Sequence, residues 1–210
     1  MQSKDFFRPR AVMVDVDGVL VRGRPDDGRR WSTSLEEDLG LAVEALQRAF
    51  FAIHWDEVLT GRATLDDRLA PVLAAIAPHL TVNRLVDYWF RQDSRLDRDL
   101  LRQLERIRAR GIGIHLATNQ EHRRARYLME TVGLEKHVDG ICHSAALGWR
   151  KPEPEFFQAA AARAGLPAAD LLLIDDLAEN IHAAAAAGWQ TLHWTGDAAA
   201  AERLEAIMAS

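Results

Sequence analysis

The second half of the chain alternates short apolar runs with segments of helical periodicity. The run at 171–175 ("LLLID") is apolar on every side, which is typical of a parallel strand covered by helices on both faces. The helical patterns at 121–133 and 152–165 end in glycine, and the second begins with proline and glutamate, as helices commonly do. Further strands are expected at 11–14, 111–118, 138–144 and 189–194, and further helices at 94–111, 177–188 and 197–209. This alternation predicts an α/β fold with a Rossmann-like parallel sheet.

The segment from about 24 to 92 has a different pattern. It contains no clear strand but three helix-like pieces at 34–50, 64–80 and 81–90, and "STSLEED" offers a Ser or Thr cap followed by acids. We therefore expect an α/β core domain formed by residues 1–22 and 93–210, with residues 23–92 inserted as an all-helical cap. Since the insertion follows the first strand directly, it is expected to cover the sheet edge like a lid.

Polar residues stand where three of the expected strands end. Asp15 follows "VMV", Thr118 and Asn119 follow "IHLA", and Asp175 and Asp176 follow "LLLI". Active groups of such folds lie at the carboxyl ends of the strands. A buried carboxylate is costly unless it is paired or bound to a metal. These aspartates therefore either lie at exposed strand ends or have a cation beside them.

Four motifs occur in order on these elements: "DVDGV", "LATN", "RKPEPEFF" and "LLLIDDLAENI". Together they resemble the haloacid dehalogenase-like (HAD) hydrolase superfamily over nearly the whole chain. The helical insertion resembles a C1-type cap. The ending of the last motif is similar to that of sugar-phosphate phosphatases and of epoxide-hydrolase-associated phosphatase domains.

The resemblance implies a role for each residue of the first motif. Asp15 is the expected nucleophile, which takes the phosphoryl group as an aspartyl-phosphate and binds Mg²⁺. Asp17 is expected to protonate the leaving group, then to activate water, and to bind Mg²⁺ through its backbone carbonyl. Gly18 allows the backbone bend that re-aims the Asp17 side chain, and it is counted among the expected phosphate-binding residues.

The remaining motifs imply the other groups of the site. Thr118, Asn119 and Lys151 are expected to bind the phosphoryl oxygens, the lysine as a fixed positive charge. Asp176 aligns with the direct metal ligand, while Asp175 is expected to act through water or a hydrogen bond.

Two more residues are candidates for the site, and some of the site residues also have a purely structural interpretation. Asn180 lies where the family often has an acid or Asn, and Ser144 is a candidate hydrogen-bond partner of Lys151. Alternatively, Thr118 and Asn119 are ordinary turn residues, and Asp176 caps the helix that follows.

Substrate contacts are expected from the first part of the cap. The candidates are Arg22, Arg24, Trp31, His54 and Trp55, although aromatic residues at helical spacing more often pack a helix interface.

Composition excludes several other classes of protein. With a net charge of −5 the chain has no overall basic footprint for nucleic acid, and no apolar run reaches the ~18 residues that a membrane span needs. The N-terminal segment lacks a signal-peptide pattern, and Cys142 has no second cysteine to pair with. These features predict a cytoplasmic protein without nucleic-acid or membrane partners. The resemblance to the HAD superfamily, many of whose members are monomers or dimers, implies a monomer or homodimer.

The predicted activity is Mg²⁺-dependent hydrolysis of a small phosphorylated metabolite, for example a sugar phosphate. A dehalogenase is the first alternative, but relatives of that kind generally lack an acid at the position of Asp17. The others are a receiver-like signalling protein and a member that binds phosphorylated ligands without turnover. Receivers carry their acidic pair after the first strand, whereas Asp175 and Asp176 come late in this chain.

Overall fold

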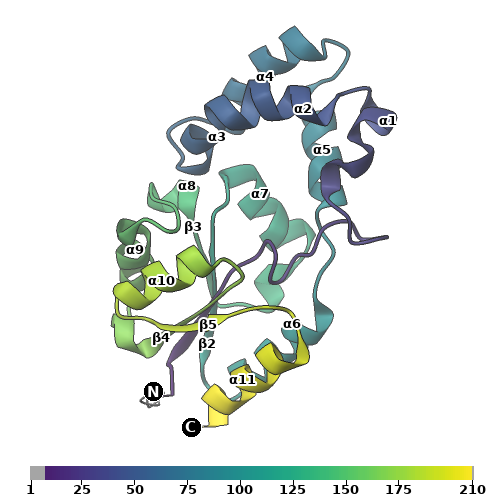
Figure 1. Cartoon of the computed structure of the whole chain (residues 1–210). Coiled ribbons are helices and arrows are strands. Elements are labelled where there is room, and N and C mark those ends of the chain that lie inside the picture. Colours follow the sequence, from purple (N-terminus) through teal and green to yellow (C-terminus); the bar gives the residue numbers. More distant parts are fainter. Residues whose placement is uncertain (1–7, 210) are drawn as a thin grey trace.

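A computed structural model describes residues 8–209, which form a five-stranded sheet beneath a group of helices (Figure 1). The N-terminal segment, for which the sequence predicts no signal peptide, lies mostly outside the described residues. The strands are β1 (Ala11–Val14), β2 (Gly113–Thr118), β3 (Gly140–His143), β4 (Leu171–Asp175) and β5 (Gln190–His193). Their order is β3-β2-β1-β4-β5, and every neighbouring pair is parallel. The predicted α/β class is confirmed, and all strand carboxyl ends meet at one edge.

Helices cover both faces of the sheet, which explains why the central strands are apolar on both sides. Val12 and Val14 pack on one face with α6 (Arg98–Arg108) and α11 (Ala198–Ala209). Ala11 and Met13 pack on the other face with α9 (Pro154–Ala164) and α10 (Ala178–Ala186). The remaining core helices are α7 (His122–Arg126), α8 (Ser144–Leu147), and the short turns η3 (Tyr127–Thr131), η4 (Leu134–Lys136) and η5 (Ala168–Asp170).

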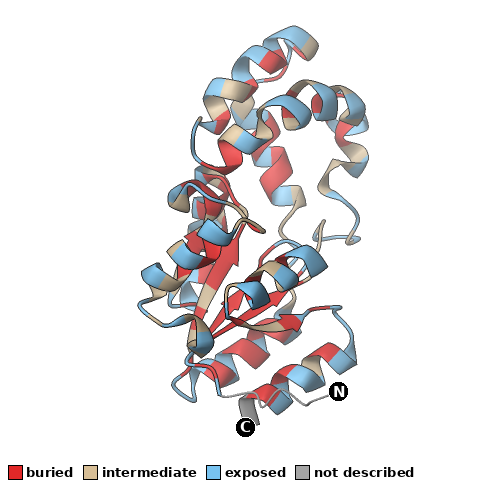
Figure 2. Ribbon diagram, turned by 60° about the vertical axis from the view of Figure 1, so that its left-hand side comes forward, coloured by how far each residue is buried: buried red, intermediate tan, exposed pale blue. Residues whose placement is uncertain are grey.

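The insertion after β1 is helical, as expected, and has its own buried apolar cluster (Figures 1 and 2). Its elements are η1 (Trp31–Ser34), α1 (Leu35–Leu39), α2 (Val43–Leu46), η2 (Gln47–Phe51), α3 (Ala52–Leu59), α4 (Leu65–Ile76) and α5 (Val82–Gln92). The placement of the cap over the strand carboxyl ends agrees with the lid arrangement. The exact boundaries at 22/23 and 92/93 stay a prediction.

Two details of the cap differ from expectation. The predicted helix 34–50 ends first at Gly40, whose left-handed φ of 66° terminates α1, and a second helical stretch then continues through η2 to Leu59. The stretch continues because Phe51 and Trp55 pack on Trp89 of α5. In addition, Ser34 makes no side-chain cap.

The hydroxyl of Ser34 instead accepts a hydrogen bond of 2.8 Å from Arg24 Nη1. Side-chain caps occur at Thr64 and Thr81, which accept hydrogen bonds from the amides of Asp67 and Arg84. Within residues 8–209, no helix combines the length and apolar character required to cross a bilayer.

Candidate active site

The end of β1 brings two aspartates to the carboxyl edge in different environments. Asp15 is buried, and its Oδ1 accepts a hydrogen bond of 2.8 Å from Val16 N. Asp17, two residues on, is about half-exposed. In the turn that follows Asp17, Gly18 adopts a left-handed φ of 84°, and a Cβ at this position would overlap the carboxylate of Asp176. Only glycine leaves room for this close approach.

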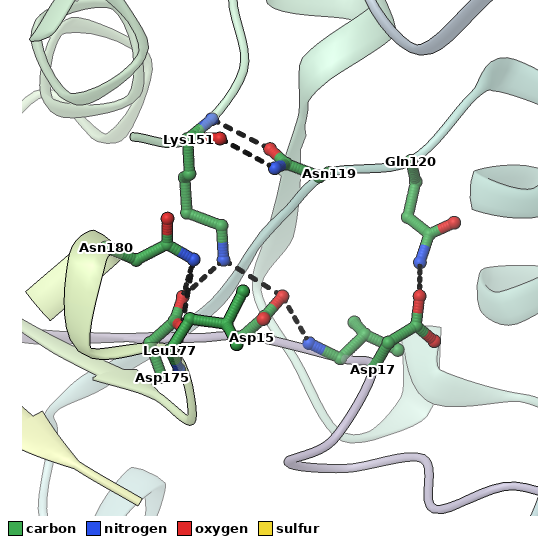
Figure 3. A network of polar contacts seen from close by, with 9 residues as sticks. Asp15, Asp17, Asn119, Gln120, Lys151, Asp175, Leu177 and Asn180 are labelled. Atoms are coloured by element: carbon green, nitrogen blue, oxygen red, sulfur yellow. Dashed lines mark hydrogen bonds and ion pairs between the residues drawn. The ribbon is translucent and has the colours of Figure 1, made fainter. Parts of the chain in front are cut away.

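Lys151 connects the first and last motifs. Its side chain is completely buried, and Nζ lies 2.6 Å from Asp175 Oδ2 and 3.0 Å from Asp15 Oδ1 (Figure 3). The side-chain amide of Asn119 holds the lysine backbone at both ends, accepting from Lys151 N at 2.8 Å and donating to Lys151 O at 2.9 Å. The expectation for Asn119 changes accordingly, because its side chain fixes Lys151 and any N–H for a phosphoryl oxygen would come from its backbone.

The two aspartates after β4 also differ. Asp175 is fully buried and accepts hydrogen bonds from Lys151 Nζ, from Leu177 N at 2.9 Å, and from Asn180 Nδ2 at 3.0 and 3.1 Å (Figure 3). Asp176 is only partly buried and faces the cavity between sheet and cap. Protein donors therefore engage Asp175, whereas Asp176 faces the cavity; that Asp176 is the direct metal ligand and Asp175 an indirect one stays a prediction.

Burial and unequal charge perturb the ionisable groups here. Burial raises the pKa of Asp15 to about 7, since Lys151 offsets only part of the effect and Asp175 adds a second negative charge. Burial acts to lower the pKa of Lys151, but Asp15 and Asp175 outweigh it, so the pKa lies above its usual value and the amine is charged. The pKa of Asp176 is raised as well, mainly by burial and further by the negative charge of Asp175. One ammonium thus faces three acidic groups.

This excess of negative charge fits a divalent cation. Asp15, Asp175 and Asp176 each offer a carboxylate oxygen, and these atoms lie within 4.8 Å of one another. Carboxylate oxygens are the ligands that Mg²⁺ prefers, and a cation would relieve their mutual repulsion. The residues present therefore suit Mg²⁺.

A cavity of about 680 Å³ opens beside Asp17 and Asp176 and extends under the cap. Of the expected substrate contacts, Arg22 and Trp31 line it, whereas Arg24, His54 and Trp55 do not. Arg24 is held by Ser34, and Trp55 packs within the cap cluster. The complete lining is Asp17, Gly18, Val21, Arg22, Gly23, Gly28, Arg29, Arg30, Trp31, Ser32, Val43, Leu46, Gln47, Phe51, Asp93 and Asp176.

Thr118 lies where the sequence predicts it, whereas Ser144 does not make its expected contact. Thr118 ends β2 and is buried at the same edge as Asp15, as expected. The expected bond between Ser144 and Lys151 is wrong, because Ser144 Oγ donates to Leu59 O at 2.6 Å and to Gln120 O at 3.2 Å. Ser144 thereby connects the core to the end of α3.

Three residues near Asp17 were not expected from the sequence. Gln120 Nε2 donates to Asp17 Oδ2 at 2.6 Å, and the buried Arg124 lies 4.0 Å from Asp17 Oδ1. Asp93, at the end of the cap, lines the cavity beside them, and burial raises its pKa to about 6 with Asp17 adding to the effect. No motif marks these residues, although Gln120 and Arg124 closely follow "LATN" in the sequence.

The parallel sheet, the helical cap and the aspartate–lysine cluster between them define an enzyme of the capped, Rossmann-like class. The chain belongs to the haloacid dehalogenase-like hydrolase family, whose family model matches residues 9–188.

Known proteins that resemble the chain agree with this assignment. It is 30% identical over 200 residues to the phosphoglycolate phosphatase of Rhodospirillum rubrum, covering 86% of this chain and 77% of that protein. It is 27% identical over 203 residues to a sesquiterpene phosphatase of Aspergillus oryzae, covering 95% and 96%. A HAD family enzyme of Bacteroides thetaiotaomicron, solved as a magnesium complex, has the same fold with a TM-score of 0.75 at 18% identity, covering 91% of this chain and 96% of that one. The chain is therefore a HAD-family hydrolase, and proteins named as phosphatases are among its relatives.

Proposed function

We propose that the protein hydrolyses a small phosphorylated metabolite with Mg²⁺, through an aspartyl-phosphate on Asp15. The observation that carries the proposal is the placement of Asp15 against Lys151, with Asp17 two residues away beside the cavity. Bound Mg²⁺ would supply positive charge that lets an anionic carboxylate approach an anionic phosphate. Asp15 and Asp176 would hold it, with the backbone carbonyl of Asp17.

The proposed reaction has two steps, formation and hydrolysis of the aspartyl-phosphate, and residues of the chain take part in both. An Asp15 oxygen attacks phosphorus, the bond from phosphorus to the ester oxygen breaks, and that oxygen takes a proton from Asp17. Asp17 then takes a proton from water, whose oxygen attacks phosphorus and breaks the bond to Asp15, so inorganic phosphate leaves. Lys151 neutralises charge on the phosphoryl oxygens, and Thr118 supplies a hydroxyl.

The cavity is large enough for a leaving group the size of a small metabolite. Its volume of about 680 Å³ lies in the range of small-molecule sites. Arginine, serine and glutamine side chains line it together with Trp31, a combination that suits a polyol such as a sugar. The relatives act on chemically different molecules by their names, phosphoglycolate and a sesquiterpene. A sugar phosphate is our proposed substrate, and a cytoplasmic monomer or homodimer our proposed state.

Asp15→Asn and Asp17→Asn test the mechanism with 4-nitrophenyl phosphate and Mg²⁺. We expect Asp15→Asn to lower kcat at least ~1,000-fold, because the nucleophile is lost. Asp17→Asn should instead accumulate phosphorylated protein, detectable by intact-protein mass, because the water is no longer activated. Asp87→Asn, an exposed aspartate of α5, is the matched control and should keep full turnover.

Two results would overturn this proposal. One is full turnover by Asp15→Asn, and the other is undiminished wild-type turnover in excess EDTA. Release of halide from 2-haloacids without phosphate release would move the enzyme to the dehalogenase alternative. A panel of sugar phosphates and other metabolite phosphates then ranks substrates by kcat/KM.

A further inference from the structure

Gln120 holds the half-exposed carboxylate of Asp17 from a fixed position. Its side chain is buried, and Nε2 donates to Asp17 Oδ2 at 2.6 Å (Figure 3). The backbone carbonyl of Gln120 accepts hydrogen bonds of 3.2 Å from Ala145 N and Ser144 Oγ. The donor therefore lies in the loop after β2 and is anchored to the start of α8, whereas Asp17 lies on the turn after β1.

Arg124 places a fixed positive charge behind the same carboxylate. Its guanidinium is buried, donates to Phe90 O at 3.1 Å and to Asp93 O, and lies over the rings of Phe90 and Tyr127. Its Nη2 is 4.0 Å from Asp17 Oδ1 and 3.7 Å from Asp93 Oδ2. Since these contacts immobilise the guanidinium, Asp17 has a fixed partner on each side.

Proton transfer requires a donor within hydrogen-bond reach of the ester oxygen, so the direction of the Asp17 carboxyl matters. A solvent-exposed aspartate would otherwise populate several rotamers. We propose that Gln120 is a positioning residue, which aims Asp17 for proton transfer with Arg124 as a fixed charge behind it. The inference rests on the proposed phosphatase mechanism, in which Asp17 gives its proton to the leaving oxygen while the bond from that oxygen to phosphorus breaks.

Dependence on the leaving group isolates this role. The kcat/KM value reports steps up to transfer of the phosphoryl group, and 4-nitrophenolate departs with little help from a proton, whereas phenolate needs one. We therefore compare kcat/KM for 4-nitrophenyl phosphate with that for phenyl phosphate in wild type and Gln120→Ala. In Gln120→Ala, kcat/KM for 4-nitrophenyl phosphate divided by kcat/KM for phenyl phosphate should rise about tenfold. Most of this rise should come from a lower kcat/KM for phenyl phosphate.

Two further variants separate positioning from a general structural effect. Gln190→Ala removes an amide that donates to Ala169 O at 3.0 Å, far along the sheet on β5, and should leave the ratio unchanged. In the Asp17→Asn background, adding Gln120→Ala should change the ratio no further, because the residue to be positioned is already gone. Thermal unfolding of each variant establishes that it is folded.

The outcomes are distinct. An unchanged ratio in Gln120→Ala overturns the inference, and so does a further change of the ratio in the double variant. If wild type turns over neither ester with Mg²⁺, the proposed function itself fails and the inference fails with it. A raised ratio in Gln120→Ala, absent in Gln190→Ala and not increased in the double variant, establishes the positioning role.

Discussion

Gly18, in the turn after β1, lies directly against the Asp176 carboxylate. Its φ is 84°, and any Cβ would overlap the Asp176 carboxylate. We expect Gly18→Ala to abolish most phosphatase activity, because Asp176 must move away from the proposed metal position. Turnover of 4-nitrophenyl phosphate across a range of Mg²⁺ concentrations measures the effect, and the concentration for half-maximal rate should rise.

Gly133→Ala is the matched control for this prediction. Gly133 has a similar φ of 86°, but nothing lies within 4 Å of its Cβ position. The substitution therefore carries the backbone strain alone, about 1 kcal/mol of unfolding free energy, and should keep full activity. Equal activity losses in the two variants would show that strain, rather than contact with Asp176, explains the effect.

The residues of the site that come from strand ends could be predicted from the sequence. Asp15, Asp175 and Lys151 meet in the structure because parallel strands and a family-like motif order bring them to one edge. Gln120 and Arg124 could not be predicted, since their contacts depend on the folded arrangement. Gln120, for instance, meets Asp17 from 103 positions away. The hydrogen bonds of the Asn119 side chain to the Lys151 backbone could not be predicted either, because they also depend on the folded arrangement.

At the scale of elements, apolar pattern and end signals were sufficient for the sheet. The five strands and the helices α9, α10 and α11 lie where the sequence predicts them. The cap was predicted less well, because the continuation of its second helix through η2 depends on aromatic contacts with α5, which is distant in sequence. Tertiary packing, rather than local propensity, decides such a boundary.

Asp139 fastens the start of β2 to the segment before β3. Its Oδ2 accepts from Ile114 N at 2.8 Å, and its Oδ1 accepts from Arg108 Nε at 2.9 Å. We expect Asp139→Asn to lower the free energy of unfolding at pH 7 by about 1 kcal/mol, a value reduced by partial exposure of the ion pair. Urea unfolding measures it.

The loss should depend on pH. Burial acts to raise the pKa of Asp139, but the hydrogen bonds from Arg108 and Ile114 N outweigh it, so the pKa lies below its usual value. A carboxyl with a lowered pKa stabilises the fold above its unfolded-state pKa, near 4, and this contribution is lost as the pH falls through the folded-state pKa. Wild type and variant should therefore converge below about pH 4. Asp99→Asn, which removes an exposed carboxylate that pairs with Arg102 of the same helix, should show a smaller difference from wild type at pH 7.

At the scale of the whole molecule, cap and core have separate apolar clusters. Polar contacts join them, together with the ring of Tyr127 of the core, which packs on Phe90 of the cap. Arg150 of the core lies 3.0 Å from Asp56 of α3, and Arg123 of α7 lies 2.7 Å from Asp66 of α4. The Ser144–Leu59 bond and the Arg124 contacts with the end of α5 also belong to the junction. A junction of this kind can loosen without loss of either apolar cluster, which allows substrate to enter beneath the cap.

Replacing both arginines should therefore loosen the cap locally rather than unfold the protein. In Arg123→Met/Arg150→Met we expect faster amide hydrogen exchange over residues 56–66 and unchanged exchange in β1 and β4, because these strands lie in the separate core cluster. Each pair is partly exposed and contributes at most about 1 kcal/mol, so the unfolding free energy should fall by no more than about 2 kcal/mol. High salt should shift wild-type exchange toward that of the variant, because salt screens exposed charges. Arg102→Met, whose partner Asp99 lies in the same helix, is the control and should leave exchange in the cap unchanged. Equal acceleration in the cap and in the strands of the sheet would mean that the two parts open as one unit, contrary to this prediction.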